Sequence, residues 1–599
     1  MMNACFGQRP PGRAPRAAIF VFAAVALLSA PAPVCASEGS ERCANMKDEY
    51  SPDVAIESCR AQLRTNPDTK NLAIIHNNLG IAYKQKGDTA RALSEYAESI
   101  RLNPRYAHPY SNRGNLYADR KEFDRAMAEY NEALRLDPQH GNALAGRSFV
   151  FYKRRDFDQA LADAEKSIRS DPDASRGYLA RGNAIYAKGD TDGAIADYGR
   201  ALARADSAKT KSTLYFNRAN VYAAKKDNDR AMADYDESIR LDSRSSDARR
   251  RRALLYLAQK NPDLALADLV EAIRLDPNST EAYLDRAQLY LDRKDFDKAV
   301  ADCDKAIAID PSSMGYYKRG LAYQYKKDFD RAIADFDATI RLEPKANNAF
   351  LMRGNIYRAV KKNYDRAIAD YDETIRIDAN STAAYFGRGL SRNRMDDYDR
   401  AIADFGDAIR LDAKSPGAFA ARADSYWAKD DKAKALADFD ETLRLAPESA
   451  TTLRQRGILR LYGTSAAAAL PDLTKAADLN PKDGYSALWL EIALRKSGQS
   501  GRLAQTRGQL DLTTWPGPLL RVFLGELDPK EANAMGRDPD STKDSEQSCE
   551  STVYLAAFVS LKGEDWRAIK LFRNGLNCPA GFIERRAAQA ALRSLGEKP

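Results

Sequence analysis

Histidines are the residues that most often carry acid–base or metal chemistry near neutral pH, and this sequence has three of them, His76, His108 and His140. No cluster of acidic residues accompanies them in the sequence. The sequence also contains no phosphate-binding loop, no nucleophile elbow and no metal-binding helix motif. We therefore expect a non-enzymatic protein with no catalytic residue, no metal site and no cofactor.

Arginines and acids that recur together are the residues whose types and spacing do suggest a chemical role. Arg319 precedes Asp335 by 16 residues, and Arg353 precedes Asp370 by 17. A guanidinium group can bind a carboxylate through two parallel hydrogen bonds, or it can bind phosphate. The sequence therefore suggests either internal ion pairs or a phosphate-binding ribbon. An aspartate or glutamate follows eleven arginines at this spacing: Arg113, Arg147, Arg181, Arg218, Arg252, Arg286, Arg319, Arg353, Arg388, Arg422 and Arg456.

These arginines belong to a repeat of about 34 residues. Ala332 lies twelve residues after the small residue Gly320 and twelve before Pro344. Apolar residues recur at helical spacing within 316–344, so each unit is expected to form two helices. The small residues let the two helices approach closely, and the proline ends the unit. The alanine recurs as Ala92, Ala126, Ala160, Ala194, Ala231, Ala265, Ala299, Ala367, Ala401, Ala435 and Ala469.

This pattern resembles the tetratricopeptide repeat. Numbered from 1 to 34, the unit has Gly320 at position 8, Tyr323 at 11, Ala332 at 20, Phe336 at 24 and Pro344 at 32. The resemblance covers about residues 73 to 483 and implies twelve units. A single hairpin cannot bury its apolar face alone, so neighbouring units stack. The resemblance implies an all-α, right-handed superhelical solenoid of helix-turn-helix units.

The helical hairpin decides between the two roles of the arginines. In an antiparallel hairpin, positions whose numbers sum to about 31 lie at the same level. The arginines stand at position 7 and the acids at position 23, so each arginine faces its acid. We therefore predict a ladder of semi-buried bidentate ion pairs that includes Arg319 with Asp335 and Arg353 with Asp370, with the acid of the preceding repeat as the alternative partner. This pairing argues against a phosphate-binding ribbon.

Cysteines lie at equivalent levels near both ends of the expected solenoid. Residues 37–72 have the pattern of a degenerate capping repeat, with Cys43 at position 8 and Cys59 at position 24. In the last hairpin, Cys549 stands at position 1 and Cys578 at position 30. The position numbers of each pair sum to 31 or 32, which predicts two disulfides that close terminal hairpins. Four reduced, packed cysteines are the alternative.

Residues 1–36 have the features of an export signal. Three arginines precede an apolar run over residues 17–30, and small residues surround the expected cleavage site after Ala36. The run is short for a membrane span of about 20 residues, so we expect a cleaved signal, with a retained anchor as the alternative. We therefore expect an exported, periplasmic protein without a membrane span after cleavage.

The resemblance implies a concave groove that is lined by the first helix of each unit. Asparagine amides in such a groove can both donate to and accept from an extended peptide, and aromatic rings add contact area. We expect protein or peptide segments as partners; a wet, unoccupied face is the alternative. The candidates are Asn112, Asn115, Tyr152, Asn183, Tyr186, Asn217, Asn220, Arg250, Arg251, Tyr317, Lys318, Tyr325, Asn355, Phe386 and Trp427.

The charge pattern contains one local exception. The net charge is +8, but basic and acidic residues alternate throughout, so we expect no nucleic-acid partner. Arg250 and Arg251 lie within a run of four arginines and are expected to face the groove, where they could bind an acidic segment. Nearby acids, Asp247, Glu281 and Asp285, could equally neutralise them.

Residues 484–599 depart from the repeat and are expected to form a helical region that ends in a tetratricopeptide-like hairpin. The polar segment 537–548 is expected to be a loop. This region is similar to the C-terminal region of periplasmic tetratricopeptide proteins of proteobacteria. The resemblance implies a scaffold or adaptor that binds protein segments in the bacterial cell envelope. A permanent structural or assembly subunit of an envelope complex is the alternative.

Overall fold

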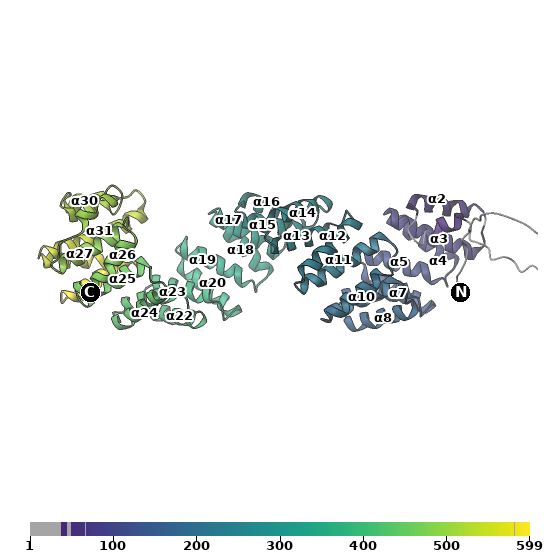
Figure 1. Ribbon diagram of the computed structural model, residues 1–599, viewed down its shortest axis with the longest axis horizontal. Helices are drawn as coiled ribbons and strands as arrows, with labels where there is room; N and C mark the ends of the chain where they lie inside the picture. Colours follow the sequence, from purple (N-terminus) through teal and green to yellow (C-terminus); the bar gives the residue numbers. More distant parts are fainter. Residues whose placement is uncertain (1–37, 45–49, 66, 580–581) are drawn as a thin grey trace, which may run out of the picture. The chain divides into compact units, whose positions relative to one another are not determined.

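The computed structural model describes residues 38–44, 50–65, 67–579 and 582–599, and these residues form helices and loops without a β-strand. The predicted all-α solenoid of helix-turn-helix units is confirmed, with helices following one another in pairs (Figure 1). None of the described helices combines the length and the apolar character that crossing a bilayer requires. The predicted export signal, residues 1–36, lies outside the described residues.

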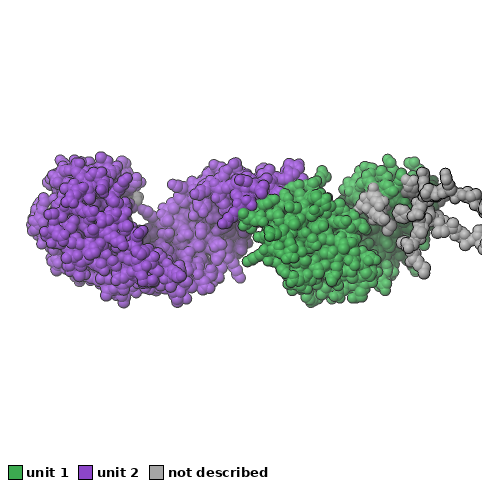
Figure 2. Space-filling view, viewed as in Figure 1, with its two compact units in different colours: residues 1–259 green, residues 260–599 purple. Residues whose placement is uncertain are grey.

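The chain divides into two compact units, Met1–Gln259 and Lys260–Pro599 (Figure 2). The helices of unit 1 are α1 (Glu38–Ala44), α2 (Pro52–Leu63), α3 (Thr69–Lys86), α4 (Thr89–Leu102), α5 (Ala107–Asp119), α6 (Phe123–Leu136), α7 (Gly141–Lys153), α8 (Phe157–Ser170), α9 (Ser175–Ala187), α10 (Thr191–Leu202), α11 (Ala208–Ala224), α12 (Asn228–Leu241) and α13 (Ser246–Ala258).

Unit 2 continues the helix pairs and ends in a less regular region. Its repeat helices are α14 (Pro262–Leu275), α15 (Thr280–Asp292), α16 (Phe296–Ile309), α17 (Ser313–Tyr325), α18 (Phe329–Leu342), α19 (Asn347–Ala359), α20 (Tyr364–Ile377), α21 (Thr382–Arg394), α22 (Tyr398–Leu411), α23 (Pro416–Ala428), α24 (Lys432–Leu445), α25 (Ala450–Gly463) and α26 (Ala466–Leu479). The later helices are α27 (Gly484–Lys496), α28 (Leu503–Thr506), the 3₁₀ turn η1 (Arg507–Gln509), α29 (Gly517–Leu524), α30 (Pro529–Met535), α31 (Ser541–Leu561), α32 (Asp565–Gly575) and α33 (Ile583–Ser594).

The hairpin of α17 and α18 shows why each unit folds as two tightly packed helices. A Cβ added to Gly320 would lie 2.9 Å from the ring of Phe336, so the absence of a side chain at Gly320 allows this close approach. Ala332 and Phe336 are fully buried. Between the helices, Lys327 adopts a left-handed backbone with φ of 62°. Asp328 then caps α18 by accepting a hydrogen bond from the backbone of Arg331.

Both predicted disulfides are confirmed, which excludes the alternative of four reduced cysteines. Cys43 in α1 is bonded to Cys59 in α2, with the Cα atoms 4.7 Å apart. Cys549 in α31 is bonded to Cys578, which follows α32, with the Cα atoms 5.4 Å apart. Each bond joins the two sides of one hairpin near an end of the solenoid. Cys303 remains a buried free thiol.

The region after α26 forms a compact helical cluster that corrects one expectation. Helix α31 begins at Ser541, so much of the segment 537–548 is helical and is not a loop. The reason is that Arg537 and the backbone of Asp538 both donate to Asp544, which anchors the polar start of the helix. The last helix, α33, packs against α25, α31 and α32.

Candidate functional site

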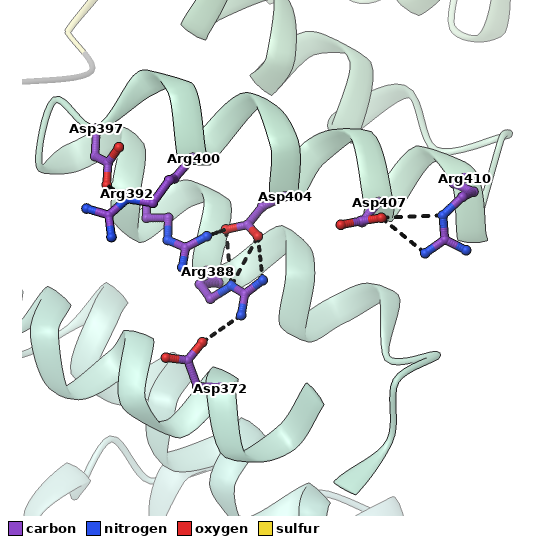
Figure 3. A network of polar contacts seen from close by, with 8 residues as sticks. All are labelled: Asp372, Arg388, Arg392, Asp397, Arg400, Asp404, Asp407 and Arg410. Carbon is purple, nitrogen blue, oxygen red and sulfur yellow. Dashed lines mark hydrogen bonds and ion pairs between the residues drawn. The ribbon is translucent and has the colours of Figure 1, made fainter. Parts of the chain in front are cut away.

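The predicted arginine column binds acids inside the solenoid. Arg388 donates from Nε and Nη2 to Asp404 of its own repeat, and its Nη1 lies 2.6 Å from Asp372 of the preceding repeat (Figure 3). Asp404 is 2% exposed and also accepts from Arg392. The same pairing joins Arg113–Glu129, Arg147–Asp163, Arg181–Asp197, Arg218–Asp234, Arg286–Asp302, Arg319–Asp335, Arg353–Asp370, Arg422–Asp438 and Arg456–Asp472.

The acid from the preceding repeat is a simultaneous partner, where the sequence suggested an alternative one. Arg319 binds Asp335 at 2.7 Å and Asp304 at 2.6 Å, and Arg353 binds Asp370 and Asp337. Asp304 and Asp337 stand at position 25, two residues after the column considered from sequence. Each of these arginines therefore holds two helices of one repeat together and also links them to the repeat before. Acidic residues such as Asp304 and Asp337 recur at position 25 of the repeat, and this recurrence in the sequence would have predicted the second partner of the arginines.

The asparagines at position 9 accept hydrogen bonds from buried tyrosines at position 24. The hydroxyl of Tyr198 donates to Asn183 Oδ1 at 2.7 Å, and that of Tyr235 donates to Asn220 Oδ1 at 2.7 Å. Burial raises the pKa of Tyr235 to about 12. A buried phenol needs such an acceptor. The same bond joins Tyr130 to Asn115 and Tyr371 to Asn355.

A correlation between two columns of the repeat explains these asparagines. In two repeats whose position 24 is phenylalanine, Phe336 and Phe405, position 9 carries Leu321 and Leu390, whereas the repeat of Phe439 has Asp424 there. Where position 24 is one of the four tyrosines above, position 9 is asparagine. The carbonyl oxygen of each of these amides already accepts an internal hydrogen bond, so less accepting capacity is left for a ligand. The amide nitrogen of these asparagines is the group that can still donate a hydrogen bond on the concave face.

Unit 1 has a hollow on the concave side of its first four repeats. Its volume is about 260 Å³. A Cβ added to Gly146 would lie 2.5 Å from the ring of Tyr130, so the glycine makes room for this tyrosine at the floor of the hollow. At the edge, Lys84 forms an ion pair with Asp119 at 2.8 Å. The lining comes from α3, α5, α7 and α9 and comprises Lys84, Asn115, Asp119, Asn142, Ala145, Gly146, Phe149, Arg176, Leu179, Ala180 and Asn183.

The other candidates of unit 1 lie along the same first helices. Asn112 donates to Asn77 at 2.9 Å, and Asn217 donates to Asn183 at 3.4 Å, so neighbouring repeats are joined by amide contacts. Tyr152 is half-buried against Phe157. The remaining three residues are Tyr186 and Arg250, which are half-buried, and Arg251, which is exposed.

In unit 2, most candidates make internal contacts but keep some exposure. Tyr317 packs on Phe336, and Phe386 packs on Phe405, in tilted ring pairs. Lys318 Nζ lies 2.6 Å from Gln288 Oε1, and burial lowers the pKa of this lysine.

Tyr325 is the exposed exception in this set. It stacks on Phe296 with 60% of its surface exposed.

Trp427 was expected to line the groove, but its side chain is buried. Its side chain is 1% exposed and lies in the same core cluster as Tyr462 and the C-terminal helices. Tyr462 packs against Phe572 of α32. The reason is that the C-terminal region folds back over the first helices of the last repeats, so inward-facing side chains there become core.

Comparisons with known proteins agree with this architecture. A family model described as tetratricopeptide repeat matches residues 77–140, 150–209, 250–313, 317–382 and 386–450, and a second model of that description matches 212–245. A comparison with curated proteins gives no significant match.

Several solved structures are similar to the chain at low sequence identity. The Cut9–Hcn1 hetero-tetramer structure of the APC/C has 14% identity and a TM-score of 0.41, covering 77% of this chain and 97% of that one. A tetratricopeptide repeat protein from Parabacteroides merdae has 22% identity and a TM-score of 0.33, covering 42% and 98%. Yeast Tom70 has 17% identity and a TM-score of 0.31, covering 69% and 96%. With family models matching more than half of its residues, the chain belongs to the tetratricopeptide repeat family, whose fold is a protein-interaction scaffold.

Proposed function

We propose that this protein is an exported scaffold or adaptor of the bacterial cell envelope that binds a protein segment on the concave face of unit 1. The hollow lined by α3, α5, α7 and α9 is the observation that carries this proposal. The lining comes from four consecutive repeats, so one bound segment would contact all of them. In repeats 2 to 4, the ion pairs of the ladder join the two helices of each repeat.

The hydrogen-bonding character of the hollow favours a ligand rich in acceptors. Asn115 and Asn183 use their carbonyl oxygens on Tyr130 and Tyr198, so their amide nitrogens are the groups available to a ligand. Arg176 adds a cationic donor, and Phe149 and Leu179 add apolar contact area. Backbone carbonyls of an extended segment supply acceptors at regular intervals. We therefore propose an extended peptide segment as the ligand.

Two features support the envelope as the compartment. Disulfides such as Cys43–Cys59 and Cys549–Cys578 persist in oxidising compartments such as the bacterial periplasm. Residues 1–36 have the pattern of an export signal. Together they support secretion across the inner membrane before the protein meets its partner.

The test is site-specific photocrosslinking in cells, followed by binding measurements with the purified pair. A crosslinker at Phe149 or Leu179 should capture one protein in stoichiometric yield. A crosslinker at Lys166, an exposed residue of the second helix α8, is the matched control and should not capture it.

Purified variants then test the face directly. The double change F149A/R176E should weaken binding of the captured protein at least tenfold, whereas K166E should leave binding unchanged. Equal binding by both variants would contradict the proposal. Stoichiometric copurification that survives F149A/R176E would instead favour a permanent structural subunit.

A further inference from the structure

Position 15 of the repeat carries a basic residue or glycine in most repeats but an acidic residue in two neighbouring ones. Position 15 turns the chain between the two helices of a unit, and its residues have a left-handed backbone. Lysine or arginine fills this position in repeats 2, 3 and 5 to 9, and glycine fills it in repeats 1 and 4. Aspartate fills it in repeats 10 and 11, as Asp396 and Asp430. The basic members are Lys121, Arg155, Lys226, Lys260, Lys294, Lys327 and Lys362.

The two aspartates are unexpected on electrostatic grounds. Asp396 follows the C-terminus of α21, and Asp430 follows that of α23. The helix dipole places partial negative charge at a C-terminus, which favours lysine and disfavours aspartate. An acid at this place therefore needs a compensating cation. The basic column of the other repeats fits the dipole, so the exception requires a local reason.

Helix α33 supplies the compensating cations. Arg585 lies 3.0 Å from Asp396, and Arg593 lies 2.9 Å from Asp430. The two arginines are eight residues apart, which corresponds to about 12 Å along a helix. The two aspartates occupy equivalent positions in successive repeats, whose packed helices are separated by about 10 Å. Helix α33 therefore runs along the stack with its arginines in register with the repeats.

A third arginine of α33 enters the groove between these two contacts. Arg586 is 2% exposed and forms an ion pair with Asp424 of α23. It also donates to Asn393 of α21 at 3.4 Å. Asp424 stands at position 9 and Asn393 at position 12, which are positions that line the concave face. In this part of unit 2, the groove is filled by a segment of the same chain.

The apolar contact of α33 is made by small side chains. Ala587, Ala588, Ala590 and Ala591 are buried; Leu592, which is fully buried, and Ile583, which is partly buried, are the larger apolar residues of this helix in the same core. Alanine buries little surface, so the hydrophobic contribution is modest for a helix of this length. The disulfide Cys549–Cys578 lies before α33 in the chain and holds the hairpin of α31 and α32 independently of it. Charge complementarity therefore has a large share in holding α33.

We infer that Asp424 of α23, together with Asp396 and Asp430 in the turns after α21 and α23, forms a second binding surface that takes a helix with two arginines eight residues apart. Helix α33 fills this surface in cis, and a partner helix with the same arginine spacing competes with it. This inference deepens the proposed function by naming a partner class for a different stretch of concave face. It uses none of the residues that line the hollow of unit 1.

A labelled peptide with the sequence of residues 582–597 tests the inference on the full chain. The wild-type chain should bind this peptide weakly, because α33 occupies the surface. The R585E/R593E chain should bind it at least tenfold more tightly in fluorescence anisotropy. A peptide that carries the same two glutamates should not bind. The F149A/R176E chain should behave like the wild type, which separates this test from that of unit 1.

A charge-swapped chain tests whether the R585E/R593E chain has lost a specific contact of α33 or is misfolded. The chain D396R/D430R/R585E/R593E restores opposite charges, so it should again exclude the wild-type peptide and recover protection of α33 from hydrogen exchange. R567E changes an exposed arginine of α32 that pairs with Glu564, and it should leave peptide exclusion intact. Failure of the swap to recover protection would overturn the inference. The inference would also be overturned if the R585E/R593E chain kept α21 and α23 protected from hydrogen exchange and still bound no peptide.

Discussion

The concave face of repeats 1 to 4 and that of repeats 10 to 12 are both built from the first helix of each repeat, yet they differ in what packs against them. In unit 1, the first helices line a hollow that contains Asn115, Asn183 and Phe149. In the last repeats of unit 2, the equivalent face packs against the C-terminal helices, and Trp427 becomes core. The framework is therefore constant, and the C-terminal helices that pack on it in unit 2 decide whether the face is available to a partner.

The difference arises from charges at a few positions. The ladder of Arg181 with Asp197 in unit 1 matches that of Arg388 with Asp404 in unit 2. Asp396 and Asp430, by contrast, have basic or glycine counterparts in repeats 1 to 9, and both contact α33. The ion pairs that hold each repeat together are thus the same in both regions, whereas the residues that contact α33 differ between them.

The largest effect is expected from breaking the shared ladder in either region. Arg181→Met and Arg388→Met each leave a nearly fully buried aspartate without its main partner, so each should cost about 3–5 kcal/mol locally. Hydrogen exchange of the helices of the affected repeat measures this loss. The double changes R181M/D197L and R388M/D404L should recover much of it, because both charges are then removed. Losses that simply add would contradict a shared structural ladder.

The next largest effect should come from the disulfides, and it should differ between the two ends. Loop closure predicts losses of about 3 kcal/mol for C43S/C59S and about 3.6 kcal/mol for C549S/C578S. Because the second bond lies in the cluster that covers Trp427, its removal should increase quenching of tryptophan fluorescence by acrylamide. C43S/C59S is the matched control and should leave that quenching unchanged. Equal quenching changes would show that the cover does not depend on the C-terminal bond.

The two regions should respond to pH in opposite directions. Burial, and then the nearby Glu550, raises the pKa of Glu584 in α33 to about 7. A raised carboxyl pKa contributes stability that is complete below about pH 4.5 and is lost as pH rises to 7, by up to about 3 kcal/mol. The positive charge of Arg454 opposes this shift, and the buried Tyr554 lies in the same cluster. Thermal unfolding of E584Q at pH 5 and pH 8 should show a smaller difference than the wild type.

In unit 1, acidification should be the destabilising direction. His108 and His140 contact each other with ring centroids 4.6 Å apart, and burial lowers the pKa of both. His140 Nδ1 accepts from the backbone of Ala143, which requires the neutral ring. Lowered histidine pKa values contribute stability that is present above about pH 6.5 and is lost as pH falls. H140N should reduce this loss in exchange measurements on α7, and an unchanged pH profile would contradict the assignment.

The smallest effect should come from the asparagine–tyrosine pairs. Asn183→Leu leaves the buried hydroxyl of Tyr198 without its acceptor and should cost about 1–3 kcal/mol. The double change N183L/Y198F imitates Leu390 and Phe405 of repeat 10, so it should recover most of the loss. Asn142→Leu, at an exposed position of the hollow, is the control and should be near neutral in the same urea titration. A double variant less stable than N183L would refute the pairing.

The repeat architecture was predictable because its signals are local. The period of 34 residues, the alanine column and the helical spacing of apolar residues each lie within one unit and recur in the next. The ion pairs within repeats, such as Arg319 with Asp335, followed from the levels of an antiparallel hairpin. Both disulfides followed from the same rule. These contacts join residues that are close in sequence, so the register of one hairpin is sufficient to place them.

Contacts between repeats were harder to predict from the sequence than contacts within one repeat. The second partner of Arg353, Asp337, belongs to the preceding unit, and its position depends on how adjacent hairpins are rotated. The acceptor role of Asn355 depends on the depth to which Tyr371 inserts between helices. Both were nevertheless encoded as correlated columns in the repeats. The expected loop over 537–548 was wrong because polar composition alone does not show that side chains such as Asp544 anchor the start of a helix.

The sequence by itself determined that the chain stacks helical hairpins, which pairs of charges join each hairpin and where the terminal disulfides form, because these properties repeat at short range. Only the tertiary structure decided which part of the concave face is covered. Arg585 and Asp396 are 189 residues apart, and no periodicity connects a unique C-terminal helix to the turn of one particular repeat. Such a contact depends on the path of the whole intervening chain, which accumulates small rotations from repeat to repeat.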